Sequence, residues 1–322
     1  MLAQVLPLEL VMAVTCPYCN RNPISESSGG WVRKNGQFKR KSDGVVVHRF
    51  LCSCKKSFSE ATSDPWYRQK KRHLNFQVVQ ELASGRSQRK TAYVLKINKN
   101  TVVRKFILLG ARSHATLLEN NRNLSNLIHN VEFDEMETSE HSKMKPLSIH
   151  LAIESKSRRI LNFKVSSMPC KGNLANKSVL KYGPRLDERP VQRLQFFEEL
   201  RPFVSEHATF KSDMNPHYPK ALKKVFPNSQ HVQTKGRRGR NSGFGELKMG
   251  GWDPIFTFNH TAAMHRENIN RLIRQTWSTT KKKERLAYHL GLYALFHNQE
   301  IITGRTKKAL AHQGEFSMQF CL

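Results

Sequence analysis

Two short segments of this chain alternate apolar and polar residues and then finish on a carboxylate. The first is Val131-Glu132-Phe133-Asp134-Glu135-Met136, and the second is Ala208-Thr209-Phe210-Lys211-Ser212-Asp213. Alternation of this kind predicts half-buried β-strands, because successive side chains point to opposite faces of a sheet. We therefore expect Asp134 and Asp213 at the far ends of two strands.

The segments around these strands predict a mixed α/β domain over residues 128–303. Further strands are expected over 147–153, 160–165 and 231–233, and helices over 191–203, 218–226, 260–277 and 284–298. Short turns allow the first three strands to pair in antiparallel order. Three antiparallel strands followed by alternating helices and strands is the element order of an RNase H-like fold. In that order the first and fourth strands are neighbours, so Asp134 and Asp213 would share one sheet edge.

Residues 72–110 have the pattern of a three-helix helix-turn-helix domain. The helices are expected over 76–82, 88–95 and 101–109, with Ser84-Gly85 ending the first, Ser87 capping the second and Asn98 in the turn before the third. The third helix is basic on its outer face, so Thr101, Arg104 and Lys105 are the predicted contacts to DNA bases or phosphates. A helical spacer between domains is the alternative. A connecting helix is expected over 111–127.

Four cysteines near the amino terminus have the spacing of metal ligands. Cys16-Pro17-Tyr18-Cys19 is followed by Cys52-Ser53-Cys54 after a β-prone, turn-rich stretch. Four thiolates would close a tetrahedral structural zinc site, which predicts a zinc-ribbon-like domain over residues 15–66. The second pair is spaced C-x-C, so His48 is an alternative fourth ligand. Reduced structural cysteines without metal are the other alternative.

The charge balance indicates a polyanionic partner. The 322 residues include 54 Lys and Arg but 25 Asp and Glu, which gives a formal net charge of +29 and a pI near 10.2. Such a balance favours phosphate backbones. No run of about 18 apolar residues exists to span a membrane. The apolar extension 1–14 carries Glu9 and no leading basic residue, unlike a secretory signal. We expect a cytoplasmic, nucleoid-associated protein that ends in a basic tail over 304–322.

Together these segments resemble bacterial insertion-sequence transposases of the DDE type that carry an amino-terminal zinc ribbon. The resemblance covers roughly residues 15–300. It rests on the order and spacing of Cys16-Pro17-Tyr18-Cys19, Phe133-Asp134-Glu135, Ser212-Asp213 followed by Tyr218-Pro219, and Arg271 to Trp277 with Lys281 to Lys283. It implies a transposase that binds double-stranded DNA at the ends of a mobile element, cleaves the strands and transfers them to target DNA. It also implies a homo-oligomer, because paired DNA ends need paired subunits.

The implied chemistry uses two Mg²⁺ ions, for which Mn²⁺ can substitute. Two metal ions activate the attacking oxygen and stabilise the leaving oxygen at a phosphodiester, and hard cations prefer carboxylate ligands. Asp134 would bridge the ions, and Asp213 would hold one of them. Glu267 and Asn259 are both candidates for the third ligand. These two residues are eight positions apart, or about 12 Å along a helix, so one metal shell cannot contain both.

Basic residues near the acids are the expected contacts to the DNA backbone. They are Arg271 and Arg274 in the last predicted stretch before the final helix, and Arg237 and Arg238 in a glycine-rich loop. Two other functions remain open. One is a catalytically inactive DNA-binding regulator derived from a transposase, in which the aspartates would be ordinary strand-end residues. The other is a structure-specific nuclease of the same fold.

Overall fold

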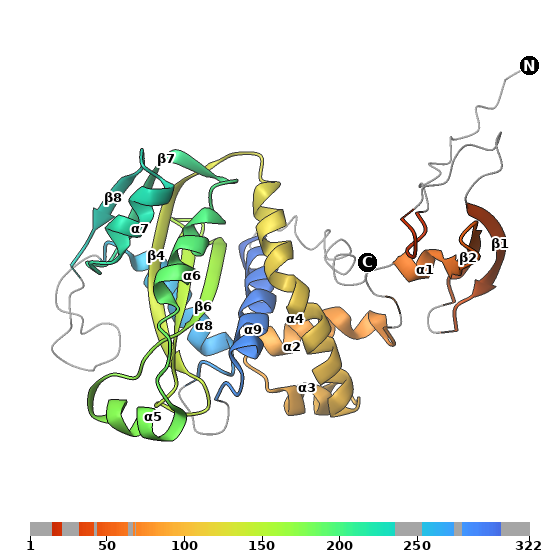
Figure 1. The fold of residues 1–322 in the computed structure, drawn as a ribbon, viewed down its shortest axis with the longest axis horizontal. Coiled ribbons are helices and arrows are strands. Elements are labelled where there is room, and N and C mark those ends of the chain that lie inside the picture. Colours follow the sequence, from red (N-terminus) through yellow and green to blue (C-terminus); the bar gives the residue numbers. More distant parts are fainter. Residues whose placement is uncertain are drawn as a thin grey trace, which may run out of the picture. The chain divides into compact units, whose positions relative to one another are not determined.

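The computed structural model describes residues 15–20, 32–41, 44–63, 67, 69–235, 253–273 and 279–303 (Figure 1). It is a mixed α/β structure with two separate sheets. The chain divides into two compact units, with the boundary between Leu74 and Asn75. No helix among the described residues is long and apolar enough to cross a bilayer.

The amino-terminal unit is a small antiparallel sheet. Its elements are β1 (Val32–Lys39), β2 (Val46–Cys52), β3 (Ser57–Ser59), α1 (Glu60–Ser63) and a 3-10 turn at Arg72–Leu74. The strand order is β1-β2-β3. Phe50 and Phe58 pack together with Cys16 and Cys52 as the buried core of this unit. So small a core makes the cysteines a large share of what holds the unit together.

The second unit is organised around a five-stranded sheet. Its strands are β4 (Ile128–Ser139), β5 (Pro146–Glu154), β6 (Ile160–Ser167), β7 (Val204–Ser212) and β8 (Gln230–Gln233), in the order β6-β5-β4-β7-β8. The β5 strand is antiparallel to its two neighbours β4 and β6, whereas β7 and β8 run parallel to β4. The prediction that the first and fourth strands are neighbours is therefore confirmed.

Helices cover both faces of this sheet. The helices that follow β6 are α5 (Ala175–Tyr182), α6 (Arg189–Glu198), α7 (Tyr218–Val225), α8 (Phe256–Asn268) and α9 (Lys283–Phe296), which continues into a π-helix at His297–Thr303. In Figure 1, α6 and α7 lie in front of the sheet and α8 lies behind it. The core between the sheet and the front helices is rich in aromatic side chains, including Phe133, Phe197, Phe210 and Tyr218.

Three helices precede the sheet, and they belong to the same compact unit. They are α2 (Asn75–Ala83), α3 (Gln88–Val94) and α4 (Lys99–Arg122). Ser87 caps α3 as predicted, since its hydroxyl accepts a hydrogen bond from the backbone N–H of Lys90. Asn98 caps α4, so this helix begins two residues before the predicted start.

The expected break between a third short helix and a connecting helix is absent. One helix, α4, runs without interruption through Gly110. A Cβ added at Gly110 would lie 2.5 Å from the Cβ of Tyr288 on α9. Glycine at this position therefore permits close contact between α4 and α9 instead of ending a helix.

Two other predicted boundaries are wrong. The β4 strand continues to Ser139, so Asp134 lies within the strand and not at its end. The polar residues after Met136 resemble a loop, but β5 pairs with the whole stretch as far as Ser139. The α8 helix covers Phe256–Asn268 instead of 260–277, because Ile269 adopts an extended conformation and ends it.

Candidate active site

The two aspartates are brought together by the register of two parallel strands. In the β4–β7 pair, Glu132 lies opposite Lys211, and the same offset places Asp134 opposite Asp213. Asp213 directly follows the last residue of β7. Both carboxylates therefore lie where the carboxyl end of β7 meets the middle of β4.

The carboxylate of Asp134 is held in place and sheltered from water. Its Oδ1 atom accepts hydrogen bonds from the Tyr218 hydroxyl at 2.8 Å and from the backbone N–H of Glu135 at 2.7 Å. Burial and, to a smaller extent, the negative charge of Asp213 together raise the pKa of Asp134 to about 6. A carboxyl group whose ionisation is opposed by burial and by a neighbouring acid is arranged as a cation site requires.

Glu135 faces the other side of β4 and has a structural role. Its carboxylate accepts hydrogen bonds from the Ser148 hydroxyl at 2.7 Å and from the Arg193 guanidinium at 2.6 Å, and it lies 3.2 Å from Nδ1 of His150. Burial alone would raise the pKa of Glu135, but the hydrogen bonds and charges of these partners lower it well below its usual range. Glu135 is therefore a buried, paired carboxylate.

Tyr218 and Arg193 are parts of the site to which the sequence analysis gave no role, although Tyr218 belongs to one of the motifs of the family resemblance. The guanidinium carbon of Arg193 lies 5.4 Å from the centre of the Tyr218 ring. Burial and the nearby Asp134 charge raise the pKa of Tyr218, so its hydroxyl stays protonated and donates to Asp134. The one available signal was the position of Tyr218 shortly after Asp213, where a helix begins.

The amino-terminal end of α8 lies against β4 beside the acids. The carboxylate of Glu132, which is 3% exposed, accepts a hydrogen bond of 2.8 Å from the backbone N–H of Phe258. Glu132 and Asp134 share one face of β4, because side chains alternate along a strand. The next residue on α8 is Asn259, whose Nδ2 donates to Oδ2 of Asp253 at 2.7 Å. Asp253 is a further residue of this area to which the sequence analysis gave no role.

Glu267 lies at the opposite end of α8. Its backbone oxygen would be 3.1 Å from a Cβ added at Gly85, and Gly85 donates a backbone hydrogen bond to the neighbouring residue Asn268. Among the described residues, no third Cys, His, Asp or Glu joins Asp134 and Asp213 closely enough to share an ion with them. The structure thus brings together Asp134 and Asp213 but not Glu267.

The predicted DNA contacts have different environments. Arg104 is exposed on α4, and Thr101 is partly exposed. Lys105 is 3% exposed, and its Nζ donates to Oδ1 of Asn75 on α2 at 2.6 Å. The expected outward orientation of Lys105 is wrong, because this position faces the contact between α2 and α4.

The other basic candidates lie close to or beyond the described segments. Arg271 follows α8, and its guanidinium lies over the ring of Phe106 at 5.4 Å. Burial and the charge of Arg285 lower the pKa of Arg271. Arg237, Arg238 and Arg274 lie outside the described residues.

The four amino-terminal cysteines form a compact group. Their sulfur atoms all lie within 4.8 Å of one another, with Cys16–Cys54 at 3.8 Å and Cys19–Cys52 at 3.6 Å. A tetrahedral zinc site with Zn–S bonds of about 2.3 Å needs sulfur atoms about 3.8 Å apart, whereas a disulfide needs about 2.0 Å. The separations therefore fit a shared metal ion and exclude disulfides. The alternative ligand His48 is not part of this group of described residues.

Comparisons with known proteins add little. No protein-family model matches the sequence, and no curated protein matches it. Among solved structures, the chain is similar to the cryo-EM structure of a piggyBac transposase synaptic complex with hairpin DNA, at 9% sequence identity and a TM-score of 0.36. The match covers 78% of this chain and 69% of that chain. A TM-score of this size does not establish a shared fold.

Proposed function

We propose that this protein is a DDE-type transposase that cleaves and transfers DNA strands at an RNase H-like site. The observation that carries the proposal is the pairing of Asp134 with Asp213 across two parallel strands, with the pKa of Asp134 raised by burial and by Asp213. If Asp134 were an isolated buried aspartate, no second carboxylate would contribute to its raised pKa. A pair of this kind is stabilised when a divalent cation neutralises it.

Different residues of the chain would have different roles in phosphodiester cleavage. Asp134 and Asp213 would hold Mg²⁺ ions, which supply activation of the attacking oxygen and stabilisation of the leaving oxygen. Tyr218 fixes the carboxylate of Asp134 through its hydroxyl. On the opposite face, Glu135 and Arg193 support Tyr218 and the strand. The acid pair is thereby presented in one fixed geometry.

Of the two candidates for the third ligand, Asn259 is the better supported. It follows Phe258, whose backbone is bound by Glu132 on the same face of β4 as Asp134. Glu267 is about 12 Å further along the same helix, towards Gly85. We infer that the carbonyl oxygen of Asn259 completes the site as a neutral ligand.

DNA binding is assigned to the basic surfaces that precede the sheet. Arg104 and Thr101, in the first turns of α4, remain the candidate contacts of a helix-turn-helix. The four-cysteine unit would act as a zinc ribbon, with Arg33, Lys34, Lys55 and Lys56 near its strands as phosphate contacts. The net charge of +29 supports this partner. An oligomer on DNA is part of the proposal, since two DNA ends must be handled together.

The experiment is a cleavage assay on DNA that carries the ends flanking the gene. Wild-type protein with Mg²⁺ should nick these ends, whereas Asp134→Asn and Asp213→Asn should bind them without nicking. Glu267→Gln should cut like the parent, and Asn259→Ala should cut more slowly. Wild-type protein that leaves the ends intact, or aspartate variants that cut normally, would contradict the proposal.

A second candidate function is a DNA-binding regulator that has lost the chemistry. The observation that favours it is the absence, within the described segments, of a third acid beside Asp134 and Asp213. Such a protein would bind the same ends with equal affinity in wild-type and Asp213→Asn forms. It would show no nicking with either Mg²⁺ or Mn²⁺.

A further inference from the structure

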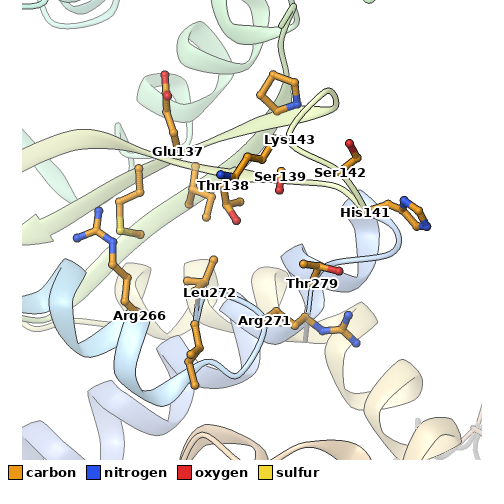
Figure 2. Close-up of a pocket in the computed structure, with 14 residues that line it drawn as sticks. Glu137, Thr138, Ser139, His141, Ser142, Lys143, Arg266, Arg271, Leu272 and Thr279 are labelled. Carbon is orange, nitrogen blue, oxygen red and sulfur yellow. The ribbon is translucent and has the colours of Figure 1, made fainter. Parts of the chain in front are cut away.

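A cavity of about 710 Å³ lies beside the carboxyl-terminal half of β4 (Figure 2). It is enclosed by the β4–β5 hairpin on one side and by the end of α8 with the segment after it on the other. Cavities of about 300 to 1,000 Å³ hold small ligands or parts of larger ones. The size therefore suits a nucleotide with its surrounding water.

The cavity adjoins the acid pair along a single strand. Met136 and Thr138, which line it, are the next two residues after Asp134 on the same face of β4. Two residues of a strand span about 7 Å. A group held at the acids and a group held in this cavity would thus be close neighbours on one DNA strand.

The walls combine apolar and cationic side chains. Met136, Ile149 and Leu272 offer apolar surface, while Arg266 and Lys143 supply positive charge. In Figure 2, Arg266 extends from α8 towards β4. Glu137 also borders the cavity, but its side chain points away from it. These side chains would suit a ligand that combines an anionic group with an apolar ring.

The two walls are fastened to each other. Glu140, at the end of the hairpin, forms a bridge with Thr280, and the backbone N–H of His141 donates to the carbonyl of Thr280 at 2.6 Å. The Glu140 carboxylate also accepts from the backbone N–H of Lys283 at 3.1 Å and pairs with Lys145 at 3.0 Å. These contacts fix the hairpin against the segment that contains Thr280 and Lys283, so this rim of the cavity is a built feature of the fold.

We propose that this cavity receives one nucleotide of the bound DNA strand, turned out of the base stack, next to the phosphate held at Asp134 and Asp213. The base would lie against Met136, Ile149 and Leu272, and Arg266 and Lys143 would face its phosphate. The inference rests on the proposed function, because it takes the acid pair as the place where the strand is cut. It adds a specificity site that reads a base outside the duplex.

The test uses fluorescence of a base analogue and does not require cleavage. The probe is a single-stranded oligodeoxyadenylate with one central 2-aminopurine, mixed with the full chain in Ca²⁺. Stacking between adenines keeps the probe dim, and none of the described lining residues is Phe, Tyr or Trp. A base that enters the cavity should therefore brighten several-fold.

Two methionine substitutions on adjacent residues provide the matched comparison. Thr138→Met fills the cavity and should abolish the brightening, whereas Glu137→Met, on the opposite side of the strand, should preserve it. Total affinity for the probe should change less than about twofold in both, because phosphate contacts elsewhere dominate it. No brightening with wild-type protein, or equal brightening in both variants, would overturn the assignment.

One further variant separates this inference from the proposed function. Asp134→Asn should lose DNA cutting but keep the brightening of the probe. Wild-type protein that brightens the probe yet cuts no DNA would contradict the proposed reaction and leave the nucleotide site standing. Wild-type protein that cuts the DNA ends but leaves the probe dim would contradict the nucleotide site and leave the proposed reaction standing.

Discussion

The hydroxyl of Tyr218 donates a 2.8 Å hydrogen bond to Oδ1 of Asp134, although 83 residues lie between them in the chain. Tyr218 is the first residue of α7, and Asp134 lies in the middle of β4. The Tyr218 ring is 1% exposed and packs against Phe133, while Arg193 covers its face. The acid pair is therefore positioned by a residue that is itself locked into the aromatic core.

Tyr218→Phe should slow DNA cleavage by changing the pKa of Asp134. The hydrogen bond from Tyr218 favours the charged carboxylate, so its loss should raise the pKa of Asp134 further above about 6. A hydrogen bond to a charged group is worth about 1.5 to 3 kcal/mol, so the rate should fall about tenfold below pH 6 and about twofold near neutral pH. The acidic limb of the pH–rate profile should move upwards by about one unit. Cleavage assays across pH at fixed Mg²⁺ measure both effects.

Tyr182→Phe is the control for this prediction. Tyr182 lies at the end of α5, where its ring contacts Lys145 and Lys181. This variant should keep the parent profile. A Tyr218→Phe profile that falls in rate without moving along the pH axis would show that Tyr218 only supports the fold.

Asp134→Asn should stabilise the metal-free protein at alkaline pH. The pKa of Asp134 is about 6 in the folded chain against an ordinary value of 3.8. The folded state therefore favours the neutral acid. Its contribution to stability is complete below about pH 4 and is lost as pH rises through 6. The variant avoids this loss, so its free energy of unfolding at pH 8 should exceed that of the parent by roughly 3 kcal/mol.

Denaturant titrations at pH 4 and pH 8 with a chelator present test the stability difference. The two proteins should differ at pH 8 and agree within about 0.5 kcal/mol at pH 4. Mg²⁺ should then stabilise the parent but not Asp134→Asn at pH 8. An equal difference at both pH values would mean that the substitution acts through packing and not through charge.

The sheet was predictable from the sequence because alternation reports directly on which side chains are buried. Phe133 and Phe210 mark the two central strands, and the order of elements placed those strands together. The end of β4 was not predictable, because Glu137, Thr138 and Ser139 look like a loop until β5 supplies their backbone partners. Pairing between strands is a property of two segments, so one segment's pattern cannot reveal it.

The site was predictable only in part for a similar reason. The spacing of acids at strand ends indicated Asp134 and Asp213. The hydrogen bonds of Tyr218 and Asp253 depend on how α7 and α8 dock, which one sequence does not encode in any short pattern. The prediction that Lys105 contacts DNA rested on its charge alone. A long basic side chain can also turn inwards and reach a buried polar atom, as Lys105 reaches the side-chain carbonyl oxygen of Asn75.

Cys16→Ser should remove bound metal from the amino-terminal unit. The four sulfur atoms have the separations of a tetrahedral zinc site, and the unit has few other buried residues. Losing one thiolate should lower the zinc content from one atom per chain to nearly none and unfold this unit, since metal binding and folding are coupled in such small domains. Metal analysis and limited proteolysis report these changes.

Cys170→Ser is the matched control for the zinc site. Its sulfur lies near the carbonyl of Lys143 in the second unit and is not part of the cysteine group. This variant should keep its zinc and resist proteolysis like the parent. Equal metal content in Cys16→Ser and Cys170→Ser would contradict the zinc assignment.

Lys105 and Arg104 are adjacent on α4, and their substitutions should have opposite consequences. Lys105 is buried and donates to Asn75 at 2.6 Å, so Lys105→Met should lower the free energy of unfolding by about 1 to 3 kcal/mol and leave the salt dependence of DNA binding unchanged. Arg104 is exposed, so Arg104→Ala should alter stability by less than about 0.5 kcal/mol. If Arg104 contacts a phosphate, Arg104→Ala should reduce the slope of log affinity against log salt by about one. Denaturant titration and DNA binding over a range of salt concentrations measure both quantities on the same preparations. A Lys105→Met protein with parent stability and a reduced salt slope would restore Lys105 as a DNA contact and remove the role assigned to the α2–α4 interface.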